Sequence, residues 1–370
     1  MTPDVLATGS VLLYRLWDLG DEIDLQRADR LFADSAPVRR KLARSEARAL
    51  SIPTSPLMVS LGVRRLVLGQ EACDIECHAT LFDFGAASVR LHVTPPTAIP
   101  WPRLVELAAS LAGHSELEAL AVDLRDHLLH RLGPAVRAMQ LAGISEDYTV
   151  VRLTGLHDAT GVPYDPGRLK ERQLAALLLP GGAGMDLRTI ASLLAHRSSY
   201  TTRDLTVLGW DAALVMEPNP ADRDVEQLLE FANAQLLELR IYDARLDGGL
   251  REMSARIAAA RRHAVGMFTG SYRALLIDLL TVVADVSELV ERAENAFKVT
   301  DDIYLGRVYT DAMRAFRADV WRADIARKLE TLRATYTMLH NETQTTRGHL
   351  LEIAIVLLFV IDIALVLLRH

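Results

Sequence analysis

Apolar and polar residues alternate in several short runs of the first 217 residues, and this alternation predicts β-strands. Other runs carry apolar residues three or four positions apart, which predicts amphipathic helices. The predicted strands are Val11–Trp17, Leu57–Leu68, Ile75–Phe84, Ser88–Thr94 and Tyr148–Leu153, with further runs in DLTVLGW and AALVMEP. The predicted helices are Asp24–Ala33, Trp101–Ala112, Ser115–Gln140, Pro166–Leu179 and Asp186–Ala195. Because the two kinds of element alternate irregularly, we expect an α+β domain at residues 1–217.

The segment MEPNPADRD interrupts this pattern. Pro218 and Pro220 stop the preceding strand, and Asp224 can cap the helix that follows. Beyond this segment the sequence shows no strand pattern and contains no proline. We therefore expect an all-α region at residues 218–341.

Two heptad seams, separated by KVTDD, predict that this region contains a long antiparallel helical hairpin of coiled-coil type. The first seam is Tyr272, Leu276, Leu279, Val283, Val286 and Val290, and the second is Trp321, Ile325, Leu329, Leu332, Tyr336 and Leu339. Either a second copy of the chain covers these seams, which predicts a homo-oligomer, or other helices of the same bundle cover them. The spacing is compatible with both arrangements.

The last run of the chain, Leu350–Leu368, is almost entirely apolar. Its 19 residues are close to the roughly 20 that a membrane span needs. With 342–349 as a polar linker, we expect one C-terminal transmembrane helix in contact with the lipid bilayer. Since no signal peptide precedes it, we expect a single-pass protein of the cell membrane with its bulk on the cytoplasmic side. Glu352 and Asp362 lie on one broad side of this helix and predict a polar stripe that faces other helices.

The net charge of −7 argues against non-specific nucleic-acid binding, and we expect no DNA partner. Cys73 and Cys77 are too few for a disulfide framework or a zinc site and predict two reduced cysteines in a strand. The common hydrolase, metalloprotease and nucleotide-binding motifs do not occur, so we expect no catalytic, cofactor-binding or metal-binding residue.

Three further features of the sequence are only weak signals of function. The glycines of LLLPGGAGMD, at positions 181, 182 and 184, indicate a flexible turn before a helix capped by Asp186. The basic cluster Arg39–Arg48 is typical of a solvated helix face, with RNA or anionic lipid as the alternative. His157 and Asp158 are a weak candidate for an active-site loop.

The C-terminal third resembles a known family. The segments LLEFANAQLLELRIYDARLD and LLEIAIVLLFVIDIALVLL, together with SYTTRDLTVLGWDAALVMEP before them, resemble the domain of unknown function 155 family. This family is named for the “required for meiotic nuclear division” proteins. The resemblance places Glu352 and Asp362 at acidic positions of its terminal membrane helix. It implies a membrane-anchored, non-enzymatic protein, whose relatives at organellar inner membranes support translation.

These features predict a scaffold or tethering protein that self-associates through its hairpin and membrane helix, with a link to translation at the membrane. Its partners would be other copies of the chain, another protein or the ribosome. One alternative is a membrane-anchored enzyme with an active site in the α+β domain. A second alternative is a binder of RNA or ribosomes at the membrane surface.

Overall fold

A computed structural model describes residues 5–33, 55–68, 71–95, 97–139, 141, 143–262, 284, 302–335, 337–338, 356 and 358. They belong to two compact units. The first unit comprises Met1–Ile241 and Asn295–Asp319, and the second comprises Tyr242–Glu294 and Val320–His370. The predicted domain boundaries, at 217/218 and 341/342, stay predictions.

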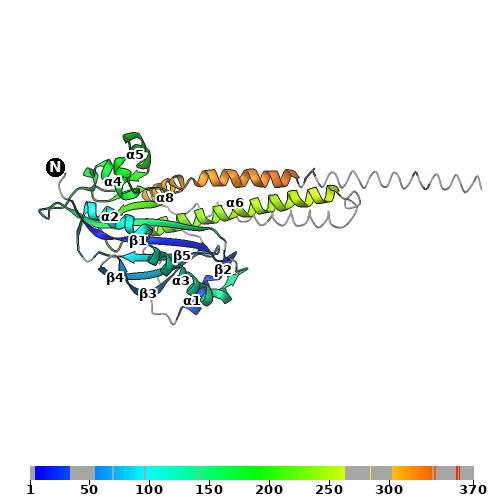
Figure 1. Cartoon of the computed structure of the whole chain (residues 1–370), viewed down its shortest axis with the longest axis horizontal. Coiled ribbons are helices and arrows are strands. Elements are labelled where there is room, and N and C mark those ends of the chain that lie inside the picture. The colour runs from blue at the N-terminus through cyan, green and yellow to red at the C-terminus, as the bar shows by residue number, and fades with distance from the viewer. Residues whose placement is uncertain are drawn as a thin grey trace, which may run out of the picture. The chain divides into compact units, whose positions relative to one another are not determined.

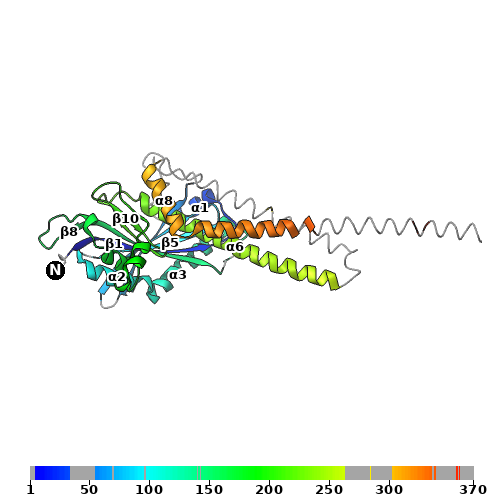
Figure 2. The same ribbon diagram turned by 90° about the horizontal axis from the view of Figure 1, so that it is seen from above.

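Within the described residues, the first unit is built around a nine-stranded mixed sheet with the order β3-β4-β5-β1-β8-β11-β10-β9, and β6 pairs with β1 at its start (Figure 1). Figure 2 looks onto several of these strands. All pairs are antiparallel except β8 with β11. The strands are β1 Leu6–Asp18, β3 Leu57–Leu68, β4 Glu71–Leu81, β5 Ala86–Val93, β6 Ile99–Pro100, β8 Ser145–His157, β9 Arg197–Ser198, β10 Leu205–Leu208 and β11 Ala212–Met216, with β2 Glu22–Ile23 and β7 Val136–Arg137 forming a separate pair.

The first unit also has helices, one of which continues into the second unit. They are α1 Leu25–Leu31, α2 Trp101–Ala112, α3 Ser115–Leu132, α4 Glu171–Leu178, α5 Leu187–Leu193, α6 Asp224–Arg262 and α8 Ile303–Ala315. Successive side chains of a strand point to opposite faces of the sheet. One of the two faces is apolar. On that face Val11, Leu13 and Val89 pack with α1 and α3, while Val151 and Leu153 pack with α2, α4 and α5.

Most predicted elements of the first unit are confirmed, with changed ends. The strand Leu57–Leu68 and the helix Trp101–Ala112 have the predicted bounds. The predicted helix Ser115–Gln140 ends earlier, at Leu132, because Gly133–Ala135 forms a 3-10 turn that contains Pro134. The α+β class of this unit and the helices after it are therefore as expected.

In the second unit, the far part of α6 lies beside a helix that covers residues 320–335. The Lys328 Nζ atom is 2.7 Å from Asp243 Oδ1 and 2.6 Å from Asp247 Oδ1, both on α6. The predicted seam residues Ile325, Leu329 and Leu332 are buried, whereas Trp321 is half-buried. The seam residues from Tyr272 to Val290, together with Tyr336 and Leu339, lie outside the described residues.

The predicted transmembrane helix, and with it the single-pass membrane location, has to be corrected. No helix of the described part of the chain is both long and apolar enough to cross a bilayer. The helix α6 has 39 residues, which is ample length, but charged side chains recur along it. The segment Leu350–Leu368, with Glu352 and Asp362, lies outside the described residues except at positions 356 and 358.

Gly85 provides a test of the turn between β4 and β5. Its φ of +100° is unfavourable for residues with a side chain, and a Cβ atom there would lie 1.8 Å from the Gly20 carbonyl oxygen. We expect Gly85→Ala to lower the free energy of unfolding by about 2 kcal/mol or more in urea denaturation. Gly113→Ala is the control, since nothing lies within 4 Å of its added methyl group. Equal stability of the two variants would contradict this account of the turn.

Candidate functional site

The second face of the sheet carries polar side chains beneath α6. Tyr14 of β1 pairs in register with Arg90 of β5, and Arg90 pairs with His78 of β4. Tyr14, Arg90 and Arg152 are all buried. Buried charges are retained in proteins when an opposite charge or a hydrogen bond compensates them. The compensation here comes from α6.

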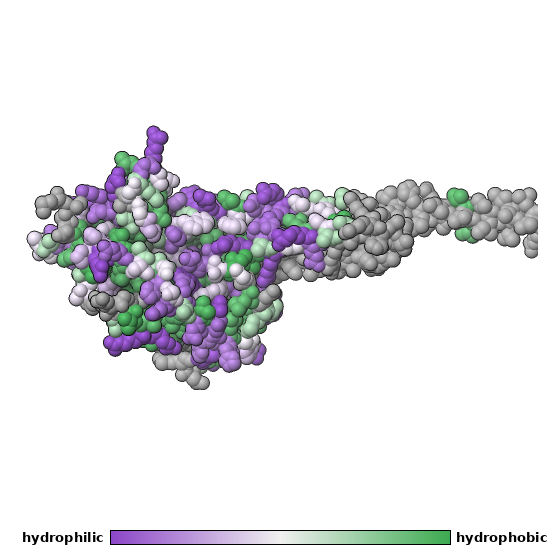
Figure 3. All heavy atoms as spheres, in the orientation of Figure 1, coloured by the Kyte–Doolittle hydropathy of each residue, from purple (hydrophilic) through white to green (hydrophobic). Residues whose placement is uncertain are grey.

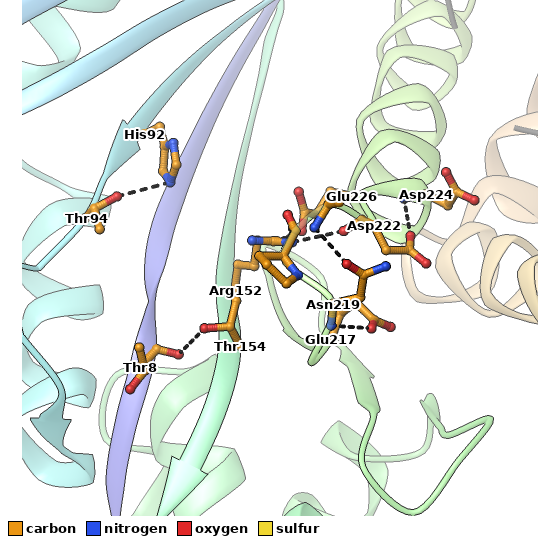
Figure 4. Close-up of polar contacts among 12 residues, drawn as sticks. Thr8, His92, Thr94, Arg152, Thr154, Glu217, Asn219, Asp222, Asp224 and Glu226 are labelled. Carbon is orange, nitrogen blue, oxygen red and sulfur yellow. Dashed lines mark hydrogen bonds and ion pairs between the residues drawn. The ribbon is translucent and has the colours of Figure 1, made fainter. Parts of the chain in front are cut away.

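Arg152 joins β8 to the start of α6. Its Nε atom donates to Glu226 Oε1, and its Nη2 atom donates to the carbonyl oxygens of Pro220 at 3.1 Å and Asp222 at 2.9 Å (Figure 4). Only 1% of Glu226 is exposed, and its Oε2 atom has no hydrogen-bond partner among the described residues. One guanidinium group thus fixes both the loop before α6 and the first turn of the helix.

A second buried carboxyl group lies one helical turn further along. Glu230 is 2% exposed. Burial raises its pKa, while the positive charge of Arg90 acts in the opposite direction. Burial likewise raises the pKa of Tyr14, which therefore remains neutral. On the neighbouring strand, burial lowers the pKa of His78 to about 4, so this imidazole is neutral near pH 7.

A pocket of about 330 Å³ lies within the first unit, where β11 leads into α6. Four separate stretches of chain line it: the loop before β10, the end of β11, the start of α6 and the start of α8. Figure 4 shows the acidic residues Glu217, Asp222, Asp224 and Glu226 gathered on this side of α6. The lining residues are Tyr200, Thr201, Arg203, Asp204, Val215, Glu217, Pro218, Asp222, Arg223, Asp224, Val225, Glu226, Asp302, Tyr304 and Leu305.

Three carboxyl groups of the pocket have raised pKa values. Burial is the main cause for each of Glu217, Asp224 and Glu226. The neighbouring carboxylate of Asp222 raises the pKa of Glu217 and of Asp224 further. Perturbed pKa values of this kind gather at functional sites, because both binding and catalysis need groups that are incompletely solvated.

Hydrogen bonds hold the remaining walls of the pocket in place. Asp204 Oδ2 accepts from the backbone N–H of Tyr200 at 2.7 Å, which closes the loop before β10. Asp302 Oδ1 caps α8 by accepting from the N–H groups of Tyr304 at 2.8 Å and Leu305 at 3.0 Å. The hydroxyl of Tyr304 lies 3.1 Å from Thr206 Oγ1 of β10. The walls are therefore built before any ligand arrives.

The weak candidates of the sequence lie elsewhere and have structural roles. Asp158 Oδ1 accepts from the N–H groups of Thr160 at 2.9 Å and Val162 at 3.0 Å, which organises a turn. Gly181 has a φ of +77°, and Asp186 caps α5, as expected for a turn before a capped helix. Both cysteines belong to β4 and form no disulfide bond, and Cys77 is buried. The cluster Arg39–Arg48 lies outside the described residues.

The sequence pattern missed the pocket because its walls are far apart along the chain. The segments SYTTRD, MEPNPADRD and KVTDD each interrupt an apolar pattern, and each ends in acidic residues. Together they supply all the acidic residues that line the pocket except Glu226, which lies two residues after the end of MEPNPADRD. Their shared signal was visible, but nothing in the spacing indicates that they meet.

Comparison with known proteins adds a family. The family described as “Uncharacterized protein MJ0711, N-terminal domain” matches residues 8–223. This chain belongs to that family. The prediction of membership in an uncharacterised family is therefore confirmed, whereas the MJ0711 family is not the domain of unknown function 155 family that the sequence resembles.

One relative within the MJ0711 family is the “Uncharacterized protein MJ0711” of Methanocaldococcus jannaschii. The two proteins are 25% identical over 178 residues, which cover 48% of this chain and 53% of the relative. The chain thus spans about half the length of the curated relative that it matches. No solved structure matches this chain.

The ion pair between Arg152 and Glu226 can be tested by double-mutant analysis. We expect Arg152→Met to lower the free energy of unfolding by about 3–5 kcal/mol, because Glu226 would stay buried without its partner. Adding Glu226→Gln should restore part of that loss. The control is Arg103→Met, which breaks an exposed pair with Glu106 and should cost less than about 1 kcal/mol. Similar losses for Arg152→Met and Arg103→Met in urea denaturation would show that the buried pair has no special role.

Asp224 predicts a pH dependence of stability. Its pKa is raised in the folded state, so its contribution to stability is largest below the unfolded pKa near 4 and is lost as the pH rises through the folded pKa. We therefore expect the Asp224→Asn variant to gain stability relative to the parent between about pH 4 and pH 7, by less than about 1 kcal/mol. Denaturation curves at several pH values measure this, with Asp123→Asn on the exposed side of α3 as the control. A gap between Asp224→Asn and parent that stays constant with pH would contradict the raised pKa.

Proposed function

We propose that this chain is a non-catalytic binding protein whose α+β unit takes up a small polar ligand in the pocket at the start of α6. The observation that supports this most is the pocket itself. Four separate stretches of chain build it, and three of its carboxyl groups have raised pKa values because of burial. Its volume of about 330 Å³ lies at the low end of the range of ligand sites, roughly 300–1,000 Å³.

The chemistry of the lining favours binding over catalysis. Among the described residues that line the pocket there is no histidine, cysteine, serine or lysine, which are the usual nucleophiles and general bases. The hydroxyl of Thr201 donates to Asp204 and so takes part in the loop structure. The alternative, an enzyme, rests on Glu217 and Asp224, whose raised pKa values suit acid–base chemistry.

An interaction role for the helices forms the second part of the proposal. It includes self-association and, as the resemblance to the domain of unknown function 155 family suggests, contact with another protein or the ribosome. The described seam residues Ile325, Leu329 and Leu332 are buried within the chain. A partner of the helices would therefore contact other residues. Figure 3 shows hydrophilic and hydrophobic residues mixed over the described part of the face in view. A partner would therefore meet a mixed surface on that face, as in many non-obligate complexes.

A ligand screen tests the binding proposal. The whole chain of 370 residues is heated with small molecules from four classes: cations, anions, polar neutral compounds and apolar compounds. A ligand at 100 times its Kd should stabilise the protein by about 2.7 kcal/mol and raise Tm by a few degrees. Hydrogen exchange should then show protection at residues 200–204, 217–226 and 302–305. Magnetic resonance of the recovered compound should show it chemically unchanged, since conversion would favour the enzyme alternative.

Protection of other segments, or no stabilising compound in any of the four classes, would contradict a ligand site in this pocket. Comparing Arg203→Ala with Arg103→Ala provides a control in the same screen. Arg203 lines the pocket, whereas Arg103 lies on the exposed side of α2. Only the first substitution should change the response.

A further inference from the structure

We propose that the ligand of this pocket is an organic cation that carries ammonium or guanidinium groups. The inference rests on the proposed binding function and adds the chemical class of the ligand. It follows from four features of the described residues: the charge of the lining, an unsatisfied buried oxygen, the spacing of the acidic groups and a pair of aromatic rings.

The lining is strongly negative. It contains six carboxylates and only two guanidinium groups, those of Arg203 and Arg223. Burial weakens the solvation of several of these carboxylates, which makes their mutual repulsion costly. A cation in the pocket would relieve that repulsion, whereas an anion would increase it.

A buried oxygen atom provides an independent indication. Glu226 lines the pocket and is only 1% exposed, yet its Oε2 atom has no hydrogen-bond partner among the described residues. The other oxygen of this carboxylate is already bonded to Arg152. Leaving a buried acceptor unpaired costs free energy, and the cost is larger when the acceptor is charged. An N–H group of a ligand that reached this atom would remove that cost.

The spacing of the acidic groups favours an extended organic cation over a single metal ion. Among the described residues, no three or more histidine, cysteine, aspartate or glutamate side chains are close enough together to hold a metal ion. The carboxylates come instead from four stretches of chain around the pocket. A molecule with two cationic groups several bonds apart can contact carboxylates on different walls at once.

Two tyrosines add a surface that suits a cation. The rings of Tyr200 and Tyr304, with centroids 5.6 Å apart, both belong to the lining. An ammonium or guanidinium group over the face of such a ring is attracted by the negative charge of the π-electrons. Burial raises the pKa of Tyr304 to about 12, so its ring stays that of a neutral phenol at physiological pH.

Calorimetric titration of the whole chain provides the test. The probes are cadaverine and agmatine as organic cations, lysine and arginine as their counterparts with a carboxylate, 1,5-pentanediol as the neutral analogue and glutarate as the anion. We expect the cations to bind at least tenfold more tightly than the diol, and glutarate not to bind. If Arg203 and Arg223 recognise a carboxylate, lysine and arginine will bind more tightly than cadaverine and agmatine; if they do not, the order is reversed. Either order agrees with a cationic ligand.

The double variant Glu217→Gln/Asp224→Asn should weaken cation binding at least tenfold. Both substitutions keep the size of the side chain, and the amide oxygen introduced at position 217 can still accept the N–H of Asn219 as Glu217 does. The control Glu116→Gln/Asp123→Asn removes two charges from exposed positions of α3 and should leave binding unchanged. Cation affinity should also rise between pH 5 and pH 8, because the cation binds the deprotonated carboxylates.

Two results would overturn the inference. The first is binding of the diol or glutarate as tight as that of the cations, with protection of the pocket segments; the binding function would then stand and the ligand class would be wrong. The second is an equal loss of cation binding in the pocket and α3 variants, which would show a general charge effect. If no probe binds and the wider screen is also empty, the proposed function itself fails.

Discussion

The buried ion pair between Arg152 and Glu226 is the constraint on which the arrangement of the first unit depends. It lies between the polar face of the sheet and the first turn of α6. The same guanidinium group binds two carbonyl oxygens of the loop between β11 and the helix. Because both charges are almost wholly removed from water, neither is stable there without the other. The position of α6, and with it one wall of the pocket, is therefore fixed by electrostatics as well as by apolar packing.

The positions of the strands and the alternation of polar and apolar residues along them could be predicted from the sequence. What surrounds the polar residues could not. In SVRLHV and VVRLT each arginine lies between a valine and a leucine, as polar residues of half-exposed strands do, so Arg90 and Arg152 would be expected to face water. In the structure α6 covers this face with Glu226 and Glu230, and both arginines are buried. Alternation reports that two faces differ, whereas it cannot report what packs against the polar one.

The C-terminal region shows a different limit. Its heptad spacing predicted which side of a helix is apolar, and Ile325, Leu329 and Leu332 are indeed buried. The described neighbour of that helix, however, is the far part of α6, held through Lys328 to Asp243 and Asp247. A repeat of apolar residues specifies the surface to be covered, and many partners can satisfy it. The transmembrane helix was predicted from the length of one apolar run and from a family resemblance, and the helices that the structure describes do not bear it out.

The family match ends at residue 223, immediately before α6 begins. The pocket therefore has walls of two kinds. Its loop before β10 and the end of β11 belong to the matched segment, while Asp224, Glu226 and the start of α8 lie beyond it. A protein that kept this sheet but attached other helices would keep the first kind of wall and replace the second. The lining of the pocket in such a scaffold can diverge without any change to the strands that support it.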